Sequence, residues 1–448
     1  MHAHSCCGML RYHFLVKPRL LILASKLGYQ TRGFAEAARN LGAEVVFGTD
    51  RCHQLDDPWR DGALPLHFDD PAAAADAACA ALRERPVQGV LALGDRPIAT
   101  AARVAQALGI SYNAADAVEG CRSKLTQRER LRDAGLPVPG FFSFALDAPL
   151  DSVLPRVAFP CVVKPLTLSA SQGVIRANNA GEFAHAVKRL SALLHSPEVR
   201  ATREPSLDRV LVEEYIPGVE VAVEGLLSHG KLRMLAIFDK PDPLEGPYFE
   251  ETIYTTPSRL PAEALWYVLE CLEGSVRALG LTHGPLHAEF RWNETGPWVL
   301  EVSPRPIGGL CSRALRFVPD ATAGVAANPI FLEELLVRHA LQMPGADWPR
   351  ELCAAGVMMI PIPRSGILQR VEGEEEARAT PCVEELHITA RLHDYIAAWP
   401  EGSSYLGFIF ARAETAAQVE AALRTAHSRL RFEITPRLAV EHPLATRH

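Results

Sequence analysis

Short apolar runs alternate with amphipathic segments through the first quarter of the chain. Apolar runs at 19–25 and 43–50 flank a segment whose apolar positions recur at helical spacing. A second helical segment, 71–85, begins on a proline and is followed by another apolar run at 87–95. Alternation of strand and helix is typical of a parallel α/β sheet. The pattern therefore predicts a small open α/β domain over residues 19–122.

The middle of the chain continues this pattern with longer elements. Residues 123–144 are predicted to form a helix and then a strand, and 158–165 to form a buried strand. The loop 166–173 is rich in small and hydroxyl residues, which favours a flexible flap whose backbone N–H groups could hold phosphate oxygens. The polar stretch 196–208 is predicted to be a second mobile loop, and 209–240 to form three strands. Further along, 373–378 is predicted to be a solvated acidic loop, and 404–434 to form a strand, a helix and a strand.

A β-hairpin is predicted at 285–305, where two alternating runs flank a short loop containing Gly296 and Pro297. If the turn centres on Thr295, one face carries the apolar cross-strand pairs Ala288 with Val302, Phe290 with Leu300, and Trp292 with Trp298. The other face carries His287, Glu289, Arg291, Val299, Glu301 and Ser303.

Glu289 and Glu301 face each other in this register. Two carboxylates at about 5 Å Cβ separation repel one another unless one is protonated or a cation lies between them. Mg²⁺ suits an all-oxygen site and needs only one or two carboxylates together with phosphate oxygens. The alternative is a solvated hairpin face on which Arg291 supplies the counter-charge. The hairpin alone leaves both interpretations open.

The composition is that of an ordinary globular protein. Hydrophobic residues occupy 48% of the 448 positions and charged residues 22%, enough for two or three domains. The net charge of −7 gives no basic field for nucleic acid or a membrane surface. The ten cysteines show no CxxC spacing, which is typical of reduced thiols in a cytoplasmic protein. Residues 1–18 contain histidines and cysteines but are interpreted as a disordered leader.

Four motifs occur in order between Lys124 and Arg305: KLTQRERLRDAGLPVP, VVKP followed by SASQGV, VEEYIPGVE, and HAE followed by LEVSPR. Together they resemble the ATP-grasp carboxylate–amine ligases, and in pattern the L-amino-acid (dipeptide) ligases. The resemblance extends from about Arg19 to the C-terminus.

The resemblance implies an α/β fold, in part α+β, built as an ATP-grasp fold. An N-terminal open α/β pre-ATP-grasp domain would cover 19–122 and the ATP-grasp domain 123–345. Its nucleotide-binding lid would lie at about 158–208. A small C-terminal α/β module would cover 346–448.

The resemblance also implies a nucleotide and a metal, namely ATP and Mg²⁺, with Mn²⁺ as an alternative. Lys124 and Lys164 would contact the phosphates, Lys164 would also lie near the adenine, and Glu220 would bind the ribose. The flap that closes over the phosphates would include Ser169, Ser171 and Gly173. The hinge strand whose backbone reads adenine would be formed by Glu213, Glu214, Tyr215 and Ile216. The metal ligands would be Glu289, Glu301 and Ser303.

Arg305 and Glu251 complete the implied site as catalytic residues. Arg305 lies four residues beyond Glu301, where its fork suits a carboxylate or the oxygens of an acyl phosphate; a structural ion pair is the alternative. Glu251 matches a family glutamate near the substrate amino group, although Glu250 is adjacent.

Two positions depart from the family pattern. Ser303 stands where the family usually has asparagine, and Gly173 is the one glycine in a flap that often has more. Neither departure removes a charged group that the chemistry needs. We therefore expect a weaker or altered metal geometry rather than loss of activity.

The implied reaction joins a carboxylic acid to an amine. A carboxylate attacks the γ-phosphate of ATP, giving ADP and an acyl phosphate, and the amine then attacks the acyl carbon. The implied partners are a small-molecule carboxylic acid, with an amino acid preferred, and an amine; a homodimer is left open. The alternatives are an ATP-grasp carboxylase or purine-biosynthesis-type ligase, and a nucleotide-binding module without catalysis.

Overall fold

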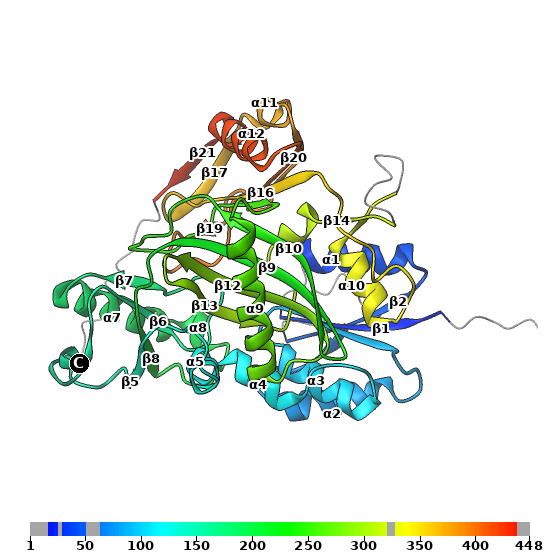
Figure 1. The fold of residues 1–448 in the computed structure, drawn as a ribbon, viewed down its shortest axis with the longest axis horizontal. Helices are drawn as coiled ribbons and strands as arrows, with labels where there is room; N and C mark the ends of the chain where they lie inside the picture. Colours follow the sequence, from blue (N-terminus) through cyan, green and yellow to red (C-terminus); the bar gives the residue numbers. More distant parts are fainter. Residues whose placement is uncertain (1–16, 26–28, 51–62, 320–327, 437–448) are drawn as a thin grey trace, which may run out of the picture.

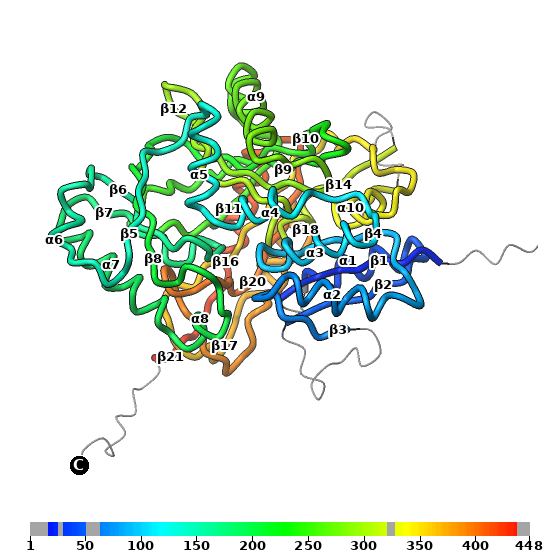
Figure 2. The backbone as a smooth tube through the Cα atoms, turned by 90° about the horizontal axis from the view of Figure 1, so that it is seen from below, coloured from blue at the N-terminus to red at the C-terminus, as the bar shows by residue number. Residues whose placement is uncertain are grey.

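A computed structural model describes residues 17–25, 29–50, 63–319 and 328–436. Figure 1 shows a central sheet with the lid (residues 141–214) at one end of the long axis and the N-terminal domain at the other. Figure 2, turned by 90°, keeps these two regions at opposite ends. Most of the predicted leader lies outside the described residues. Within them, no helix is both long and apolar enough to cross a membrane.

The N-terminal domain is a four-stranded parallel sheet, as the strand–helix alternation predicts. Its strand order is β3-β2-β1-β4, and every neighbouring pair is parallel. The apolar run of β1 is buried along its whole length. The elements are β1 (Arg19–Ala24), α1 (Tyr29–Asn40), β2 (Glu44–Thr49), β3 (Ala63–Pro65), α2 (Pro71–Leu82), β4 (Gly89–Leu93) and α3 (Ile98–Leu108).

The lid is an antiparallel sheet in the order β5-β8-β6-β7. One face is covered by a helix whose apolar side chains pack on the strands, with Phe183 and Leu190 fully buried. The elements are β5 (Phe141–Ala145), α6 (Leu150–Val153), β6 (Cys161–Pro165), β7 (Ile175–Ala177), α7 (Ala180–Leu194), α8 (Pro197–Arg200) and β8 (Arg209–Glu214), with a 3₁₀ turn at Leu154–Arg156.

The central sheet has eight strands in the order β13-β12-β9-β10-β11-β16-β20-β18. It includes the hairpin predicted at 285–305 and two of the three strands predicted at 209–240; the first of those three is β8 of the lid. Its strands are β9 (Val219–Ser228), β10 (Lys231–Lys240), β11 (Ile253–Thr256), β12 (Gly284–Asn293), β13 (Gly296–Ser303), β16 (Ala354–Ile360), β18 (Val383–Ile388) and β20 (Gly407–Ala413).

Helices and short strands surround this sheet (Figure 1). The remaining helices are α4 (Ala115–Arg122), α5 (Lys124–Asp133), α9 (Ala262–Leu279), α10 (Leu332–Ala340), α11 (Glu374–Arg378) and α12 (Ala416–Arg429), with a 3₁₀ turn at Cys311–Ala314. The remaining strands are β14 (Arg316–Phe317), β15 (Ile330–Phe331), β17 (Gly366–Glu372), β19 (Tyr395–Ile396) and β21 (Arg431–Thr435).

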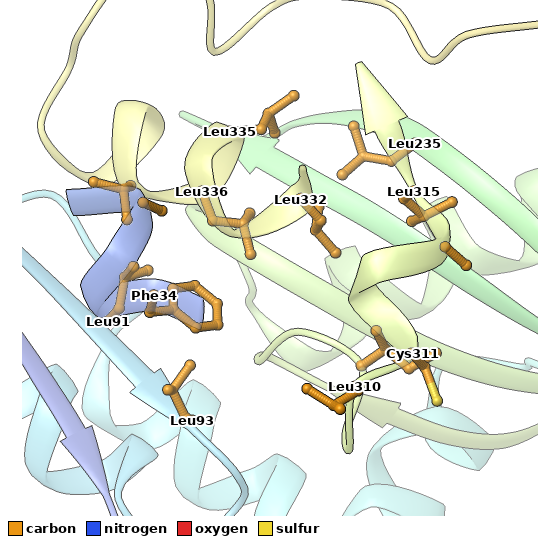
Figure 3. Packing of buried hydrophobic residues seen from close by; sticks show 14 of the residues in the cluster. Phe34, Leu91, Leu93, Leu235, Leu310, Cys311, Leu315, Leu332, Leu335 and Leu336 are labelled. Atoms are coloured by element: carbon orange, nitrogen blue, oxygen red, sulfur yellow. The ribbon is translucent and has the colours of Figure 1, made fainter. Parts of the chain in front are cut away.

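One apolar core joins the N-terminal domain to the central sheet. Figure 3 shows Phe34 of α1 and Leu93 of β4 in the same cluster as Leu336 of α10 and Leu310. Leu235 of β10 belongs to the cluster as well. This shared core fixes the carboxyl end of the N-terminal sheet next to the polar face of the hairpin.

The hairpin forms as predicted, but half of its register is wrong. Ala288 pairs with Val302 and Glu289 with Glu301, as expected. A β-bulge then places Val299 opposite Phe290, where Leu300 was predicted, and the remaining pairs shift with it. Trp292 consequently pairs with Pro297 instead of Trp298. The bulge turns Val299 into the core, where it is fully buried, and leaves Leu300 on the polar face.

Local predictions also need correction at two polar segments. The stretch 196–208 contains the helix α8 instead of loop alone, and its Glu204 is buried. The acidic segment Glu374–Arg378 forms α11, where a loop was expected. In the C-terminal part, the predicted strand–helix–strand at the end of the chain is β20, α12 and β21. Three strands of this part, β16, β18 and β20, extend the central sheet.

Candidate active site

A cavity of about 480 Å³ lies between the N-terminal domain, the lid, the central sheet and the C-terminal module. The N-terminal domain supplies Asp95, the lid supplies Lys164, the hairpin supplies Glu301, and the C-terminal module supplies Tyr405. Except for Gly173 and Ser303, every site residue predicted from the sequence lines this cavity. These are Lys124, Lys164, Ser169, Ser171, Glu213, Glu214, Tyr215, Ile216, Glu220, Glu251, Glu289, Glu301 and Arg305.

The polar face of the sheet is ordered in rows that cross the strands. Glu224 of β9 pairs with His287 of β12, which in turn pairs with Ser303 of β13. Two residues further along β12, Glu289 pairs with Glu301. After two more residues, Arg291 pairs with Glu220 of β9, which also pairs with Lys240 of β10. The rows follow from strand alternation, because positions two apart lie on the same face. Ser303 lies buried in the first row, away from the cavity lining.

Glu289 and Glu301 are the two carboxylates that the sequence predicts as metal ligands. Glu289 Oε1 lies 3.1 Å from Lys240 Nζ and 3.4 Å from His287 Nε2. Burial acts to raise the pKa of Glu289, but Lys240 and His287 outweigh it and hold the pKa well below its usual range. Glu301 Oε1 lies 3.4 Å from Lys124 Nζ. The donor set of carboxylate oxygens next to a cavity fits Mg²⁺.

A buried lysine joins three carboxylates beside this pair. Lys240 Nζ lies 2.7 Å from Glu220 Oε1, and it also contacts Glu251 and Glu289. Oxygens of these three glutamates lie within 4.8 Å of one another. Burial, together with the neighbouring carboxylates, raises the pKa of Glu251 to about 7, against the opposing effect of Lys240. The Tyr254 hydroxyl donates to Glu251 over 2.7 Å.

Lys164 is held inside the lid by an ion pair. Its Nζ lies 2.6 Å from Glu213 Oε2, and Arg128 Nε donates to Glu213 Oε1 over 2.8 Å. Burial lowers the pKa of Lys164 to about 8, even though Glu213 acts to raise it. Arg128 also donates to the Leu300 carbonyl at the bulge, so this network ties the lid to the hairpin. Glu213 thus contributes a buried side chain as well as backbone.

Hydrogen bonds connect the backbone of the hinge residues to neighbouring segments. The Tyr215 N–H donates to Pro160, and the Ile216 carbonyl accepts from Arg291 Nη1 over 2.7 Å. Arg291 Nε also lies 3.1 Å from Glu220 Oε2. Both oxygens of Glu220 are therefore in contact with a cation, and further lone pairs on them can still accept from a sugar hydroxyl.

Arg305 forms an ion pair across the domain boundary. Its Nε donates to Asp95 Oδ1 over 2.8 Å and its Nη2 to Asp95 Oδ2 over 3.2 Å. Burial opposes both charges, yet the pair lowers the pKa of Asp95 and raises that of Arg305. This is the structural alternative considered for Arg305, formed inside the cavity. Its predicted catalytic role stays a prediction.

Five charged residues of the site were not among the predicted site residues, although His287 was placed on the polar face of the hairpin: Arg128, Asp95, Glu224, Lys240 and His287. Lys240 had no usable signal, because a regular hairpin around the turn at 228–231 pairs it with Val219, and the bulge between Met234 and Ala236 is what places it opposite Glu220. Asp95 had a signal, because it ends an apolar strand of a parallel sheet, where such sheets bind ligands. Arg128 and Glu224 had none, because nothing local shows that a charged residue there is buried.

The flap is closed against the C-terminal module. The Gly173 N–H donates to the Pro400 carbonyl over 2.9 Å, so it is not directed at the cavity. Gly173 has φ of 75°, and a Cβ there would lie 2.8 Å from Leu190, which explains the glycine. Ser169 and Ser171 remain at the cavity. Lys124 Nζ donates to the Leu168 carbonyl over 2.8 Å, beside the flap.

Comparisons with known proteins agree with this architecture. Residues 157–314 match the ATP-grasp domain, 35–110 the ATP-grasp N-terminal domain, and 358–435 the L-amino acid ligase C-terminal domain 2. The crystal structure of an L-amino acid ligase from Bacillus licheniformis has a TM-score of 0.78 and 27% identity, over 94% of this chain and 99% of that one.

Curated relatives match parts of their own length. The uncharacterized protein y4rH of Sinorhizobium fredii is 26% identical over 78% of this chain and 69% of its own length. Carnosine synthase 1 of Gallus gallus is 30% identical over 51% of this chain, which spans 25% of that protein. The chain therefore contains an ATP-grasp domain and is an ATP-dependent ligase. It is a carboxylate–amine ligase that resembles the L-amino acid ligases.

Proposed function

We propose that this ligase joins the carboxylate of an amino acid to an amine through an acyl phosphate, with release of ADP and phosphate. The observation that carries the proposal is the convergence of Glu289, Glu301, Lys124 and Arg305 on one cavity. Carboxylates for a metal, an ammonium for phosphates and a guanidinium for an oxyanion are the groups that phosphoryl transfer to a carboxylate requires.

Mg²⁺ is the proposed metal, held by Glu289 and Glu301. When bound, it would neutralise phosphoryl oxygens of ATP. Glu301 lies beside Lys124, so cation and lysine would act on the same phosphates. Ser303 is buried and does not line the cavity, which argues for a minor part in metal binding.

The remaining roles follow from position along the cavity. Lys164 from the lid is proposed to hold the phosphates, and Tyr215 with its neighbours 213–216 to hold the adenine. A carboxylate oxygen of the substrate attacks the γ-phosphorus, and the bond to the ADP oxygen breaks. Arg305 stabilises the acyl phosphate while the amine nitrogen attacks the acyl carbon, phosphate leaves, and the amine releases a proton. Glu251 is proposed to lie near the substrate amino group.

The domain limits support the same proposal. We assign residues 19–122 to the pre-ATP-grasp domain, 123–345 to the ATP-grasp domain, and 346–448 to the C-terminal module. The lid predicted at about 158–208 falls within the larger lid of residues 141–214. The cavity takes residues from each of these, so substrate binding requires all of them. The family match at 358–435 favours an amino-acid ligase over a carboxylase or a purine-type ligase.

Single amino acids and pairs of amino acids, incubated with ATP and scored by phosphate release and product mass, test this function. The expected result is a condensed product formed with ADP and phosphate in equal amounts. AMP with pyrophosphate as the products would exclude the acyl-phosphate mechanism, because that mechanism breaks only the bond between the β- and γ-phosphates. ATP hydrolysis that no amino acid stimulates would favour a module without ligase activity.

A further inference from the structure

The flap of the lid contacts one short segment of the C-terminal module, Trp399–Glu401. Besides the bond from Gly173 to Pro400, the Gln172 side chain donates to the Glu401 carbonyl over 2.7 Å. Trp399 Nε1 donates to the Ala170 carbonyl over 3.2 Å. Three hydrogen bonds thus connect three residues of the flap, Ala170, Gln172 and Gly173, to three consecutive residues of the module.

An ion pair reinforces this contact from the helix behind the flap. Arg189 of α7 contacts Glu401 through Nε and, over 2.9 Å, through Nη2, which makes the pair bidentate. The same guanidinium donates to the Tyr248 hydroxyl. Side-chain exposures of 32% for Arg189 and 40% for Glu401 place the pair at the surface. Such a pair contributes little to global stability, so its effect is expected to be local.

The geometry points to a latch, and we propose that Arg189 and Glu401 are positioning residues that hold the flap closed over the cavity. The pair acts through the backbone of the module segment, which fixes Gly173 and Gln172, and these carry Ser169 and Ser171 at the cavity wall. In this arrangement the C-terminal module holds the flap of the lid in its closed position. Opening the flap requires these contacts to separate.

The latch has a specific consequence for the reaction, which rests on the proposed acyl-phosphate chemistry. An acyl phosphate exposed to water is hydrolysed to carboxylate and phosphate, so ATP is consumed without amide being formed. A closed flap excludes that water until the amine has attacked. Weakening the latch should therefore raise the number of ATP molecules consumed per amide bond, and this change should be larger in fold terms than any decrease in the rate of ATP hydrolysis.

Glu401→Gln is the sharpest variant, because it removes the charge of the pair while the Glu401 carbonyl and the Arg189–Tyr248 contact can remain. We expect several-fold more ADP per amide than in the wild-type protein. We also expect faster hydrogen exchange at amides 169–174 without any ligand. The exchanged pair Arg189→Glu with Glu401→Arg should restore part of both properties. Glu385→Gln is the control, because Glu385 also pairs with an arginine, through Arg313 Nη2, as well as with His387, and its side chain is 31% exposed.

The outcomes separate the latch from the proposed function. An unchanged ADP-to-amide ratio together with unchanged flap exchange in Glu401→Gln would overturn the latch, as would equal changes in Glu385→Gln. Loss of activity with a normal ratio, not restored by the exchanged pair, would also overturn it. If the wild-type protein forms no amide, the ligase proposal fails, and flap exchange alone still decides whether the latch exists.

Discussion

At the scale of single residues, two neighbouring glutamates of the site have pKa values shifted in opposite directions. Glu289 is in contact with Lys240 and His287, and its pKa is held well below the usual range. Glu251 shares the same lysine, yet burial and its acidic neighbours raise its pKa to about 7. The difference follows from the number of cations within reach, because Glu289 has two and Glu251 has one. Glu289 is therefore suited to hold a metal over a wide pH range.

Glu301→Gln should reduce Mn²⁺ affinity in the presence of ADP by at least about tenfold, since even outer partners of metal sites account for 10- to 100-fold. One ligand charge is lost while the strand keeps its shape, so the melting temperature should stay close to that of the wild-type protein. Mn²⁺ binding followed by electron paramagnetic resonance measures the first effect. Glu294→Gln, at the exposed hairpin tip, is the control. Wild-type Mn²⁺ affinity in Glu301→Gln would remove Glu301 from the metal site.

Lys164 gives a pH dependence with a defined sign. Its pKa is lowered to about 8, so the side chain is charged below that pH and neutral above it. Affinity for ADP should therefore be highest below about pH 8 and weaken as the pH rises. Loss of one charged hydrogen bond corresponds to roughly a tenfold decrease or more.

Lys164→Arg is the control for this prediction, because an arginine keeps its charge throughout the range. Calorimetric titration of ADP between pH 7 and 9.5 makes the comparison. A wild-type profile as flat as that of Lys164→Arg would show that Lys164 does not bind the phosphates as a cation.

At the scale of elements, the hairpin shows what a local pattern can predict. Glu289 was placed opposite Glu301 correctly although the turn lies between Glu294 and Thr295, because the extra residue of the bulge restores the register assumed for a turn centred on Thr295. The prediction failed at Val299 and Leu300, because two adjacent apolar residues satisfy the pattern in either register. A bulge is decided by packing under the strand and by bonds such as that from Arg128 to the Leu300 carbonyl, neither of which is local in sequence.

Because of the bulge, we expect Val299→Ala to destabilise the protein more than Leu300→Ala, which is the reverse of what the regular register predicts. Val299→Ala removes two methyl groups from a fully buried position, which should cost about 1.5–3 kcal/mol. Leu300→Ala shortens a side chain at the cavity wall and should cost less, while it changes the KM for ATP. Thermal unfolding of the two variants makes the comparison. The regular register predicts the opposite order, so a lower melting temperature for Leu300→Ala would contradict the bulge.

At the scale of the whole molecule, the lid is attached to both of its neighbours. Glu204, in a stretch predicted to be a mobile loop, lies 2.7 Å from Arg96 and 2.8 Å from Arg122 next to the N-terminal domain. The flap meets the C-terminal module at Trp399–Glu401. Composition predicted both segments as loops, since they are polar and rich in small residues. It could not show their partners, which are roughly 80 to 230 residues distant in the chain.

The same limit explains which parts of the architecture the sequence predicts. The order of the predicted strands and helices in the N-terminal domain follows from local periodicity and was correct, but the three-residue edge strand β3 was not predicted. The continuous eight-stranded sheet was not foreseen, because β11 pairs with β16 about 100 residues later and both strands have ordinary apolar patterns. The family resemblance, by contrast, rests on short motifs in a fixed order, which local sequence does contain.

Because the lid contacts both the N-terminal domain and the C-terminal module, we can predict which amides nucleotide binding protects from hydrogen exchange. A non-hydrolysable ATP analogue should slow hydrogen exchange at flap amides 169–174 and, through their shared bonds, at 399–405. It should leave α12 nearly unchanged, because that helix packs on the far part of the central sheet and does not line the cavity. Exchange measured by mass spectrometry at peptide resolution gives all three regions in one experiment.

In Glu401→Gln the protection should persist at the flap and diminish at 399–405. Equal protection of α12 and the flap, or protection of the flap without any change at 399–405 in the wild-type protein, would mean that the lid closes independently of the C-terminal module.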